Sequence, residues 1–135
     1  MRLRGWIRRL LCVSVRVEGR SMEPTFPDGA QLWLSRLPYT LMAPRRGDVV
    51  AVRAPSPAHR VDLKRVVGLP CETVTWQRGR LAVNGRCLDE PYAAIPPAPP
   101  GDEEAQTLHL GPNQYAVAGD NRVYSCDSRM YGPVT

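Results

Sequence analysis

The sequence predicts a mostly β protein, with a single antiparallel β domain and few helices. Fourteen prolines and eleven glycines stand among 135 residues, which favours many turns over long helices. Short runs of alternating apolar and polar residues recur along the chain, and no segment keeps a helical period over three turns. Because a chain of this length forms one modest core, a small barrel or a folded sheet is the expected architecture.

Four segments carry strand signals. Residues 30–34 (AQLWL) form an apolar run, and residues 47–54 (GDVVAVRA) form another that follows a turn. Residues 72–88 form the clearest hairpin, because apolar residues alternate on both sides of QRGR and an Asn-Gly turn signal follows. Residues 114–120 (QYAVAGD) form the last strand, after a proline-rich and then acidic loop at 93–106.

The basic residues are concentrated at the start of the chain. The formal net charge is +5, and six arginines fall within the first twenty residues. Such an arm either binds an anionic membrane surface or is a solvated tail. It lacks the interleaved aromatic residues of a stacking platform, so nucleic acid is not an expected partner. The apolar run from Leu10 to Val15 is far shorter than the roughly 20 residues that span a bilayer.

No cofactor or metal site is expected. The cysteines form no CxxC pair, and the histidines His59 and His109 are isolated. Two disulfides would be possible outside the cytoplasm, but buried free thiols are the expected state. The four cysteines are Cys12, Cys71, Cys87 and Cys126.

Lys64 is the only lysine beside seventeen arginines, and it lies in the apolar stretch VDLKRVVGLP. A buried lysine loses its proton more readily and can then act as a general base, whereas arginine stays protonated in proteins. Ser21 lies in EGRSMEPTFPDG, whose two prolines exclude a helix interior, and a serine nucleophile needs such a base. The alternatives are a surface lysine and a turn serine, or a histidine as the base.

The segment at 118–134 is dense in hydrogen-bonding side chains directly after the last strand. As a surface loop it would be ordinary, but as the wall of a site it supplies a hydroxyl and paired charges. An ion pair between Asp127 and Arg129 would hold the loop. The polar residues are Asp120, Asn121, Arg122, Ser125, Asp127, Ser128 and Arg129.

Four ordered motifs, which cover about residues 15 to 134, resemble those of the type I signal peptidases, the membrane-bound Ser/Lys proteases. The family's Ser-Met-x-Pro-Thr motif reads SMEPT at 21–25, and its Arg-Gly-Asp motif reads RGDVVA at 46–51. Its lysine motif reads KRVVGLPCE at 64–72, and its last motif reads GDNRVYSCDSR at 119–129. Arg-Gly-Asp is also an integrin-binding sequence, but the motif's place before a strand favours a turn.

The resemblance implies a role for each matching residue. Ser21 is the nucleophile, Lys64 the general base, and Ser125 the serine that helps to orient the lysine. Some relatives have a serine at the position of Gly19 that donates to the oxyanion; here the backbone N–H of Ser21 is the expected donor. Asp127 and Arg129 match a structural ion pair near the site, and Asp120 and Asn121 match loop scaffolding.

The resemblance also implies the substrate and the place of action. Secretory preproteins would be cut after a small-x-small pattern such as Ala-x-Ala, at the outer face of a bacterial plasma membrane or, alternatively, at the mitochondrial inner membrane. Residues 1–17 would then be a membrane-proximal segment, with contact to anionic lipids, and residues 18–135 the catalytic domain. The high arginine and proline content favours a GC-rich bacterium.

Three departures from the family are visible. Cys71-Glu72 replaces the usual Gly-Asp, and glycine suits a backbone angle that other residues rarely adopt. The chain shows no transmembrane segment and ends at Thr135, so we expect either an unusually short gene product or a fragment of a longer one. Two other readings remain: an inactive membrane-surface binding module, and a self-cleaving Ser/Lys repressor, although no DNA-binding domain or Ala-Gly site precedes Ser21.

Overall fold

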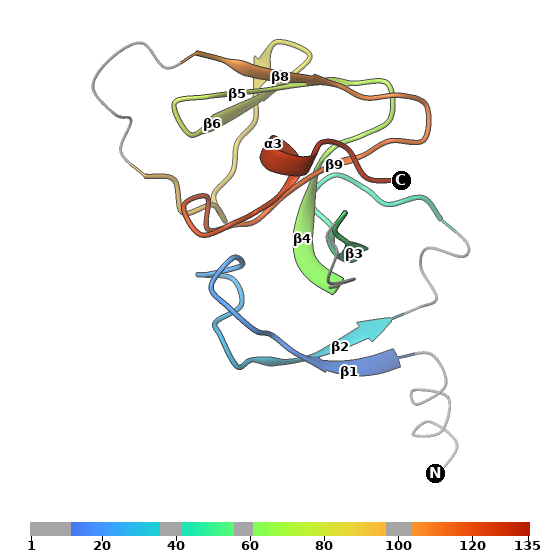
Figure 1. The fold of residues 1–135 in the computed structure, drawn as a ribbon, viewed down its shortest axis with the longest axis vertical. Coiled ribbons are helices and arrows are strands. Elements are labelled where there is room, and N and C mark those ends of the chain that lie inside the picture. The colour runs from blue at the N-terminus through green and yellow to red at the C-terminus, as the bar shows by residue number, and fades with distance from the viewer. Residues whose placement is uncertain (1–11, 36–41, 56–60, 97–103) are drawn as a thin grey trace.

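The computed structural model describes residues 12–35, 42–55, 61–96 and 104–135. Within these ranges the chain forms three antiparallel sheets and one short helix, so the predicted β class is confirmed (Figure 1). The sheets have the strand orders β1-β2, β3-β4-β9 and β7-β6-β5-β8.

The β1-β2 sheet is a two-stranded hairpin at one end of the molecule (Figure 1). Strand β1 spans Cys12–Arg16 and pairs with β2, Gln31–Ser35, in a register that places Ser14 opposite Trp33. The strand expected at residues 30–34 corresponds to β2, whereas the sequence did not predict β1. Of the basic segment 1–17, residues 1–11 lie outside the described residues, and β1 forms most of the remainder.

The central sheet is built around β4, the longest strand of the described structure. Strand β4 spans Val61–Gly68 and pairs with β3, Val49–Arg53, on one side and with β9, Ala116–Ala118, on the other. Its pairing with β9 shifts register between Val66 and Gly68. The strands expected at 47–54 and 114–120 correspond to β3 and β9, whereas the sequence did not predict β4.

The third sheet contains the hairpin that the sequence predicted. Strands β5 (Thr73–Gln77) and β6 (Arg80–Val83) pair directly, and β7 (Arg86–Cys87) and β8 (Gln106–His109) extend the sheet on its two sides. Both turns use positive φ angles: 52° and 72° at Arg78 and Gly79, and 48° and 78° at Asn84 and Gly85. Two successive positive φ angles are what a two-residue hairpin turn with the twist of a β-sheet requires.

The apolar core lies between the second and third sheets, because both contribute alternate residues to it. It comprises Val67, Val74, Trp76, Leu81, Val83, Leu110, Ala116 and Ala118. Gly68 allows this close packing, since a Cβ at that position would lie 2.5 Å from a methyl group of Val74 and 2.9 Å from the Cβ of Ala116. Helix α3, Ser128–Tyr131, then packs against β9, and Val134 pairs with Tyr115 at the end of the chain.

The turn at Cys71 keeps the glycine-like backbone despite its different residue. Cys71 has a φ of 65°, which L-residues other than glycine seldom adopt. Glu72 accepts hydrogen bonds from the Leu69 N–H and from Arg46, and so anchors the turn to the loop before β3. All four cysteines are free, and the expectation that they are buried is wrong for Cys71, Cys87 and Cys126, which are exposed.

Candidate active site

The loop that carries Ser21 is held in place from beneath. Residues 21–25 form consecutive turns between β1 and β2, and the side chain of Met22 is almost fully buried under them. The backbone carbonyl of Ser21 accepts a hydrogen bond from the N–H of Asn121 at 2.9 Å. Ser21 itself stays partly exposed. The Ser21 loop and the loop after β9 are therefore joined at the residue that sequence analysis proposed as the nucleophile.

Lys64 lies in the middle of β4 and is 3% exposed. It faces Val50 across the β3-β4 pair and lies two residues before Val66, so it shares a face with the apolar cluster of Val50, Val66 and Val117. This burial lowers the pKa of Lys64, while the negative charges of Asp62 and Asp127 raise it less strongly. No hydrogen bond or ion pair of the Lys64 side chain is formed with any residue that the structure describes.

Ser21 and Lys64 line the same cavity. Its volume is about 470 Å³, and Gly19, Tyr124 and Tyr131 contribute to its walls. A second cavity of about 330 Å³ meets the first at Ser21 and is lined largely by apolar side chains. These are Val15, Val17, Met22, Leu34, Ala51, Val61 and Leu63.

Ser125 is held in a buried network behind the site. Its hydroxyl donates to Asp127 Oδ2 at 2.6 Å and accepts from the Gly119 N–H at 3.0 Å. Asp127 also pairs with Arg129 through Nε at 2.8 Å and Nη2 at 2.9 Å. The structure contains no hydrogen bond between Ser125 and Lys64, so the orienting role of Ser125 stays a prediction.

Opposing effects set the charge state of Asp127. Burial alone would raise the pKa of Asp127, but the hydrogen bonds and the positive charge of Arg129 outweigh it. Hydrogen bonds from Ser125 and from the N–H of Gly119 act in the same direction, so the pKa lies below its ordinary value. Asp127 is therefore ionised at neutral pH, and it also caps helix α3.

Asp120 connects three parts of the chain. Arg65, the residue after Lys64, donates to it through Nε at 2.8 Å and Nη2 at 2.7 Å, and Thr25 donates through its hydroxyl at 2.5 Å. Arg65 also donates to the carbonyl of Gly47 at 2.7 Å and lies 4.1 Å from the ring centre of Tyr92. The network thus links the Ser21 loop, β4 and the loop after β9. Sequence analysis placed Asp120 as scaffolding but did not find Arg65.

Gly19 lies at the rim of the cavity and contributes no side chain to it. Its φ is 86°, and its N–H donates to Asp28 at 2.9 Å. The N–H of Ser21 donates no hydrogen bond to any described residue and is available for an oxyanion.

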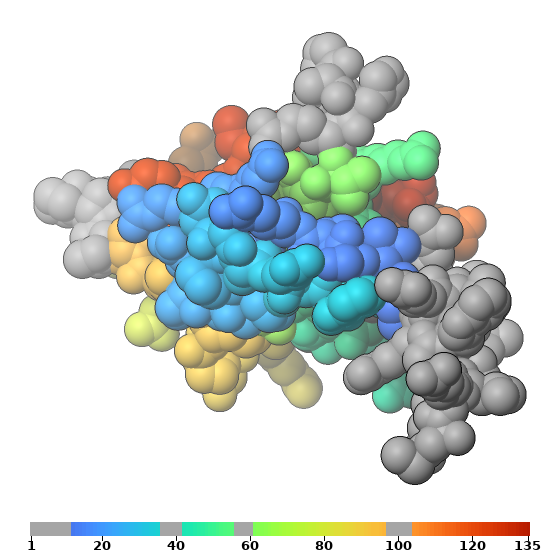
Figure 2. All heavy atoms as spheres, turned by 90° about the horizontal axis from the view of Figure 1, so that it is seen from below, coloured from blue at the N-terminus to red at the C-terminus, as the bar shows by residue number. Residues whose placement is uncertain are grey.

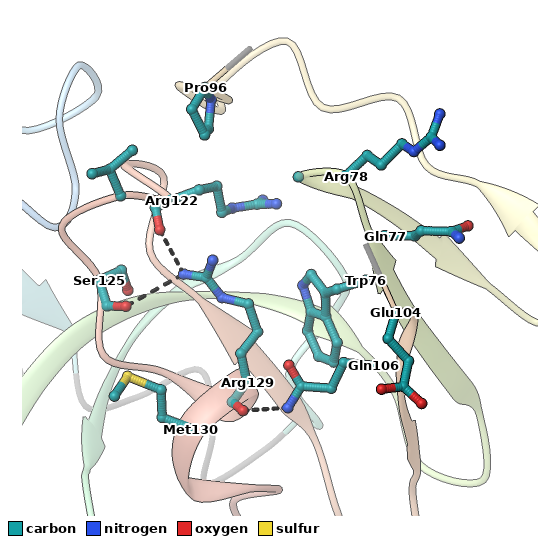
Figure 3. Close-up of a pocket in the computed structure, with 12 residues that line it drawn as sticks. Trp76, Gln77, Arg78, Pro96, Glu104, Gln106, Arg122, Ser125, Arg129 and Met130 are labelled. Carbon is teal, nitrogen blue, oxygen red and sulfur yellow. Dashed lines mark hydrogen bonds between the residues drawn. The ribbon is translucent and has the colours of Figure 1, made fainter. Parts of the chain in front are cut away.

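A further cavity, of about 440 Å³, is lined by residues of the loop after β9 and of the third sheet (Figure 3). Ser125 and Arg129 line it, but Ser21 and Lys64 do not. Figure 3 shows Arg129 pointing back to the carbonyls of Arg122 and Ser125, with hydrogen bonds of 3.0 and 3.3 Å. The buried ion pair between Arg122 and Glu90 could not be predicted from the sequence. The two residues are far apart along the chain, and the motif that contains Arg122 does not include Glu90 or indicate that either side chain is buried.

Gly119→Ala is expected to damage the site more than the fold. A Cβ at Gly119 would lie 2.3 Å from Ser125 Oγ and 2.6 Å from the carbonyl oxygen of Ser21, so both residues must shift. Such overpacking costs about 1–3 kcal/mol of stability. The measurement is urea unfolding together with acylation of Ser21 by a serine-directed probe. Gly85→Ala is the control for destabilisation away from the site, since its Cβ meets nothing within 4 Å but its φ of 78° strains an alanine; equal acylation of both variants would contradict the geometry.

Among the described residues, no helix is long and apolar enough to cross a membrane. No group of three or more potential metal ligands occurs in the same ranges.

Comparison with known proteins gives a consistent set of similarities. The family model described as "Signal peptidase, peptidase S26" matches residues 3–135. Signal peptidase I V of Bacillus subtilis (strain 168) is 33% identical over 138 residues, covering 95% of this chain and 81% of that protein. Probable signal peptidase I-2 of Synechocystis is 36% identical and covers 93% of this chain, but the chain spans only 58% of that relative.

A solved structure is similar as well. The crystal structure of a signal peptidase I from Enterococcus faecalis V583 aligns with a TM-score of 0.55 and 34% identity. The alignment covers 68% of this chain and 89% of that one. The predicted antiparallel fold therefore has a counterpart of the same architecture.

Proposed function

The chain belongs to the signal peptidase family, peptidase S26, a family of serine endopeptidases, and on that premise we propose that it removes signal peptides with Ser21 as nucleophile and Lys64 as general base. The observation that carries the proposal is that a partly exposed serine and a buried lysine line one cavity. Neutral Lys64 takes the Ser21 proton as Oγ attacks the scissile carbonyl, and the Ser21 N–H donates to the oxyanion. The lysinium then protonates the leaving amine, and Lys64 next activates the water that hydrolyses the acyl-enzyme.

The lowered pKa of Lys64 supports its role as a base. An ordinary lysine has a pKa of 10.5 and is almost wholly charged at neutral pH. Burial against the apolar cluster beside β3 and β4 favours the neutral form, which is the one that accepts a proton. Arg129 acts in the same direction through its positive charge.

The apolar cavity beside Ser21 supports a small-x-small cleavage pattern. Valine, leucine, alanine and methionine side chains make up most of its lining and leave about 330 Å³, with Arg16, Glu18, Ser21 and Asp62 as the polar residues around them. Side chains of an extended peptide alternate in direction, so alternate residues before the scissile bond enter the cavity together. Small apolar residues at those two positions match its chemistry.

The β1-β2 hairpin supports action at a membrane surface. Its strands cross the face that Figure 2 shows, in blue to cyan, and the hairpin exposes Trp33 on one of its faces and Val13 on the other. Exposed aromatic and apolar side chains together with a net charge of +5 suit contact with an anionic lipid surface. The proposed place of action is the outer face of a bacterial plasma membrane.

The test is cleavage of a purified preprotein with an Ala-x-Ala site, in detergent and in lipid vesicles. The expected result is one cut after the second alanine, identified from the N-terminal sequence of the product. Replacement of both alanines by leucine should abolish the cut, because the proposed specificity requires small residues at both positions. Cleavage at other sites, or none under any condition, would contradict the proposal.

The pH dependence distinguishes Lys64 from a histidine base. Because Lys64 acts in its neutral form, kcat/KM should rise with pH and level off below pH 10.5. A histidine base would give a rise centred near about pH 6.5. Rates measured from pH 5 to 10 decide between them. The variants His59→Asn and His109→Asn should keep the wild-type profile, and loss of the rise in either one would reject Lys64 as the base.

A further inference from the structure

Asp62 lies beside the proposed catalytic pair, where two cavities meet. It lies on β4 two residues before Lys64, so the two side chains leave the strand on the same face. It lines both the cavity that holds Lys64 and the apolar cavity, and Ser21 lines both as well. Asp62 therefore flanks the position at which a scissile bond meets Ser21.

The Asp62 carboxylate has no partner among the residues that the structure describes. It forms no hydrogen bond there, and its oxygens form no ion pair with Lys64. The buried carboxylates near the site differ, because Glu90, Asp120 and Asp127 are each paired with an arginine. Asp62 is partly buried, so it is accessible to a ligand yet less hydrated than an exposed acid.

Within the described ranges, no other charged side chain that lines the two cavities forms an ion pair with Asp62. Glu18 lines the same two cavities and is also acidic. Arg20 lines the Lys64 cavity, but its guanidinium is held by Glu23 at 3.0 Å and lies over the ring of Tyr124 at 4.7 Å. Arg16 lines only the apolar cavity, and its side chain lies over Gly29. Among the described residues that line the Ser21 and Lys64 cavity, Asp62 and Glu18 are thus the two acids, neither of them in an ion pair, and the nearby cation is Lys64, whose pKa Asp62 raises.

We propose that Asp62 selects preproteins that carry a basic side chain in the first two residues after the scissile bond. This inference rests on the proposed signal peptidase activity. The small residues before the scissile bond occupy the apolar cavity, so the peptide leaves Ser21 through the cavity with polar walls. A lysine or arginine placed there meets Asp62, with Glu18 close by, and forms a charge-assisted hydrogen bond.

The expected preference is modest, because Asp62 is only partly buried. Pairs of this kind change affinity by about threefold to fivefold, and added salt screens them. Two substrates that differ at one residue report the preference as a ratio of kcat/KM. Any change that Asp62 makes to the pKa of Lys64 affects both substrates equally at one pH, and it cancels in that ratio.

The experiment uses preproteins with an Ala-x-Ala site and arginine, glutamine or glutamate at the first or second residue after it. The wild-type chain should cleave the arginine substrate about threefold to fivefold better than the glutamine substrate, and less so at high salt. Asp62→Asn should bring the ratio to about one, Asp62→Glu should restore it, and Asp62→Arg should favour glutamate. Asp89→Asn removes the same charge from an exposed site outside both cavities and should keep the wild-type ratio.

Equal cleavage of the arginine and glutamine substrates by the wild-type chain would overturn the inference and leave the proposed function standing. Cleavage of none of the substrates would overturn both. Circular dichroism establishes that each variant is folded. If Asp62→Asn does not fold, the salt dependence of the wild-type ratio decides: a preference that does not fall as salt rises would overturn the assignment.

Discussion

Lys64→Arg is expected to reduce preprotein cleavage by about 10³-fold or more, and Ser21→Ala by a similar factor. Arginine is also a long basic side chain, but it stays protonated, so it cannot accept the Ser21 proton. Alanine at residue 21 removes the attacking oxygen. Single-turnover cleavage with enzyme in excess measures both effects without the influence of product release.

Lys64→Met is the matched control for folding. It fills the same space without a buried amine, so it should unfold at the same or a higher urea concentration than the wild-type chain while remaining inactive. The double variant Ser21→Ala with Lys64→Met should be no slower than either single variant, because the two residues act as one unit. Residual activity above about a tenth of the wild-type rate in Lys64→Arg would show that another group is the base.

Local turn chemistry explains which part of the fold could be predicted. The β5-β6 hairpin follows from apolar residues that alternate on both sides of its turn and from Gly79, which tolerates a positive φ through its own backbone. Strand β4 was missed because Asp62, Lys64 and Arg65 interrupt its apolar pattern. Asp62 and Lys64 line a cavity, and Arg65 pairs with Asp120, which lies far away in the sequence. The residues next to β4 in the sequence therefore do not indicate that the strand can accommodate these charges.

In the site, too, the sequence indicates the residues but not the tertiary contacts that surround them. The order of the four motifs identifies Ser21 and Lys64 as candidates, and the structure places both on one cavity. The burial that lowers the lysine pKa is tertiary, since it comes from residues on β3 and β9. The sequence also could not show that the Ser125 hydroxyl is used by Asp127 and Gly119.

Asp120→Ala is expected to destabilise the protein by about 3–5 kcal/mol and to abolish cleavage. Asp120 is fully buried, and Arg65, whose side chain is 11% exposed, keeps its charge whether or not a partner is present. The hydrogen bond to Asp120 raises the pKa of Arg65 further above its ordinary value. Arg65 therefore does not lose its proton to avoid the cost of a buried charge. Removing the carboxylate therefore leaves a buried cation and an unpaired Thr25 hydroxyl. Urea unfolding followed by fluorescence measures the loss.

Thr25→Val separates the effect on the site from the effect on the fold. It removes one hydrogen bond to Asp120 and leaves the ion pair with Arg65, so it should cost only about 1 kcal/mol. Because Thr25 lies in the loop that positions Ser21, cleavage should fall in this variant even though most molecules stay folded. If Thr25→Val keeps full activity while Asp120→Ala loses it, Asp120 acts through stability alone. If activity falls in both, the hydrogen-bond network around Asp120 positions Ser21 as well as stabilising the fold.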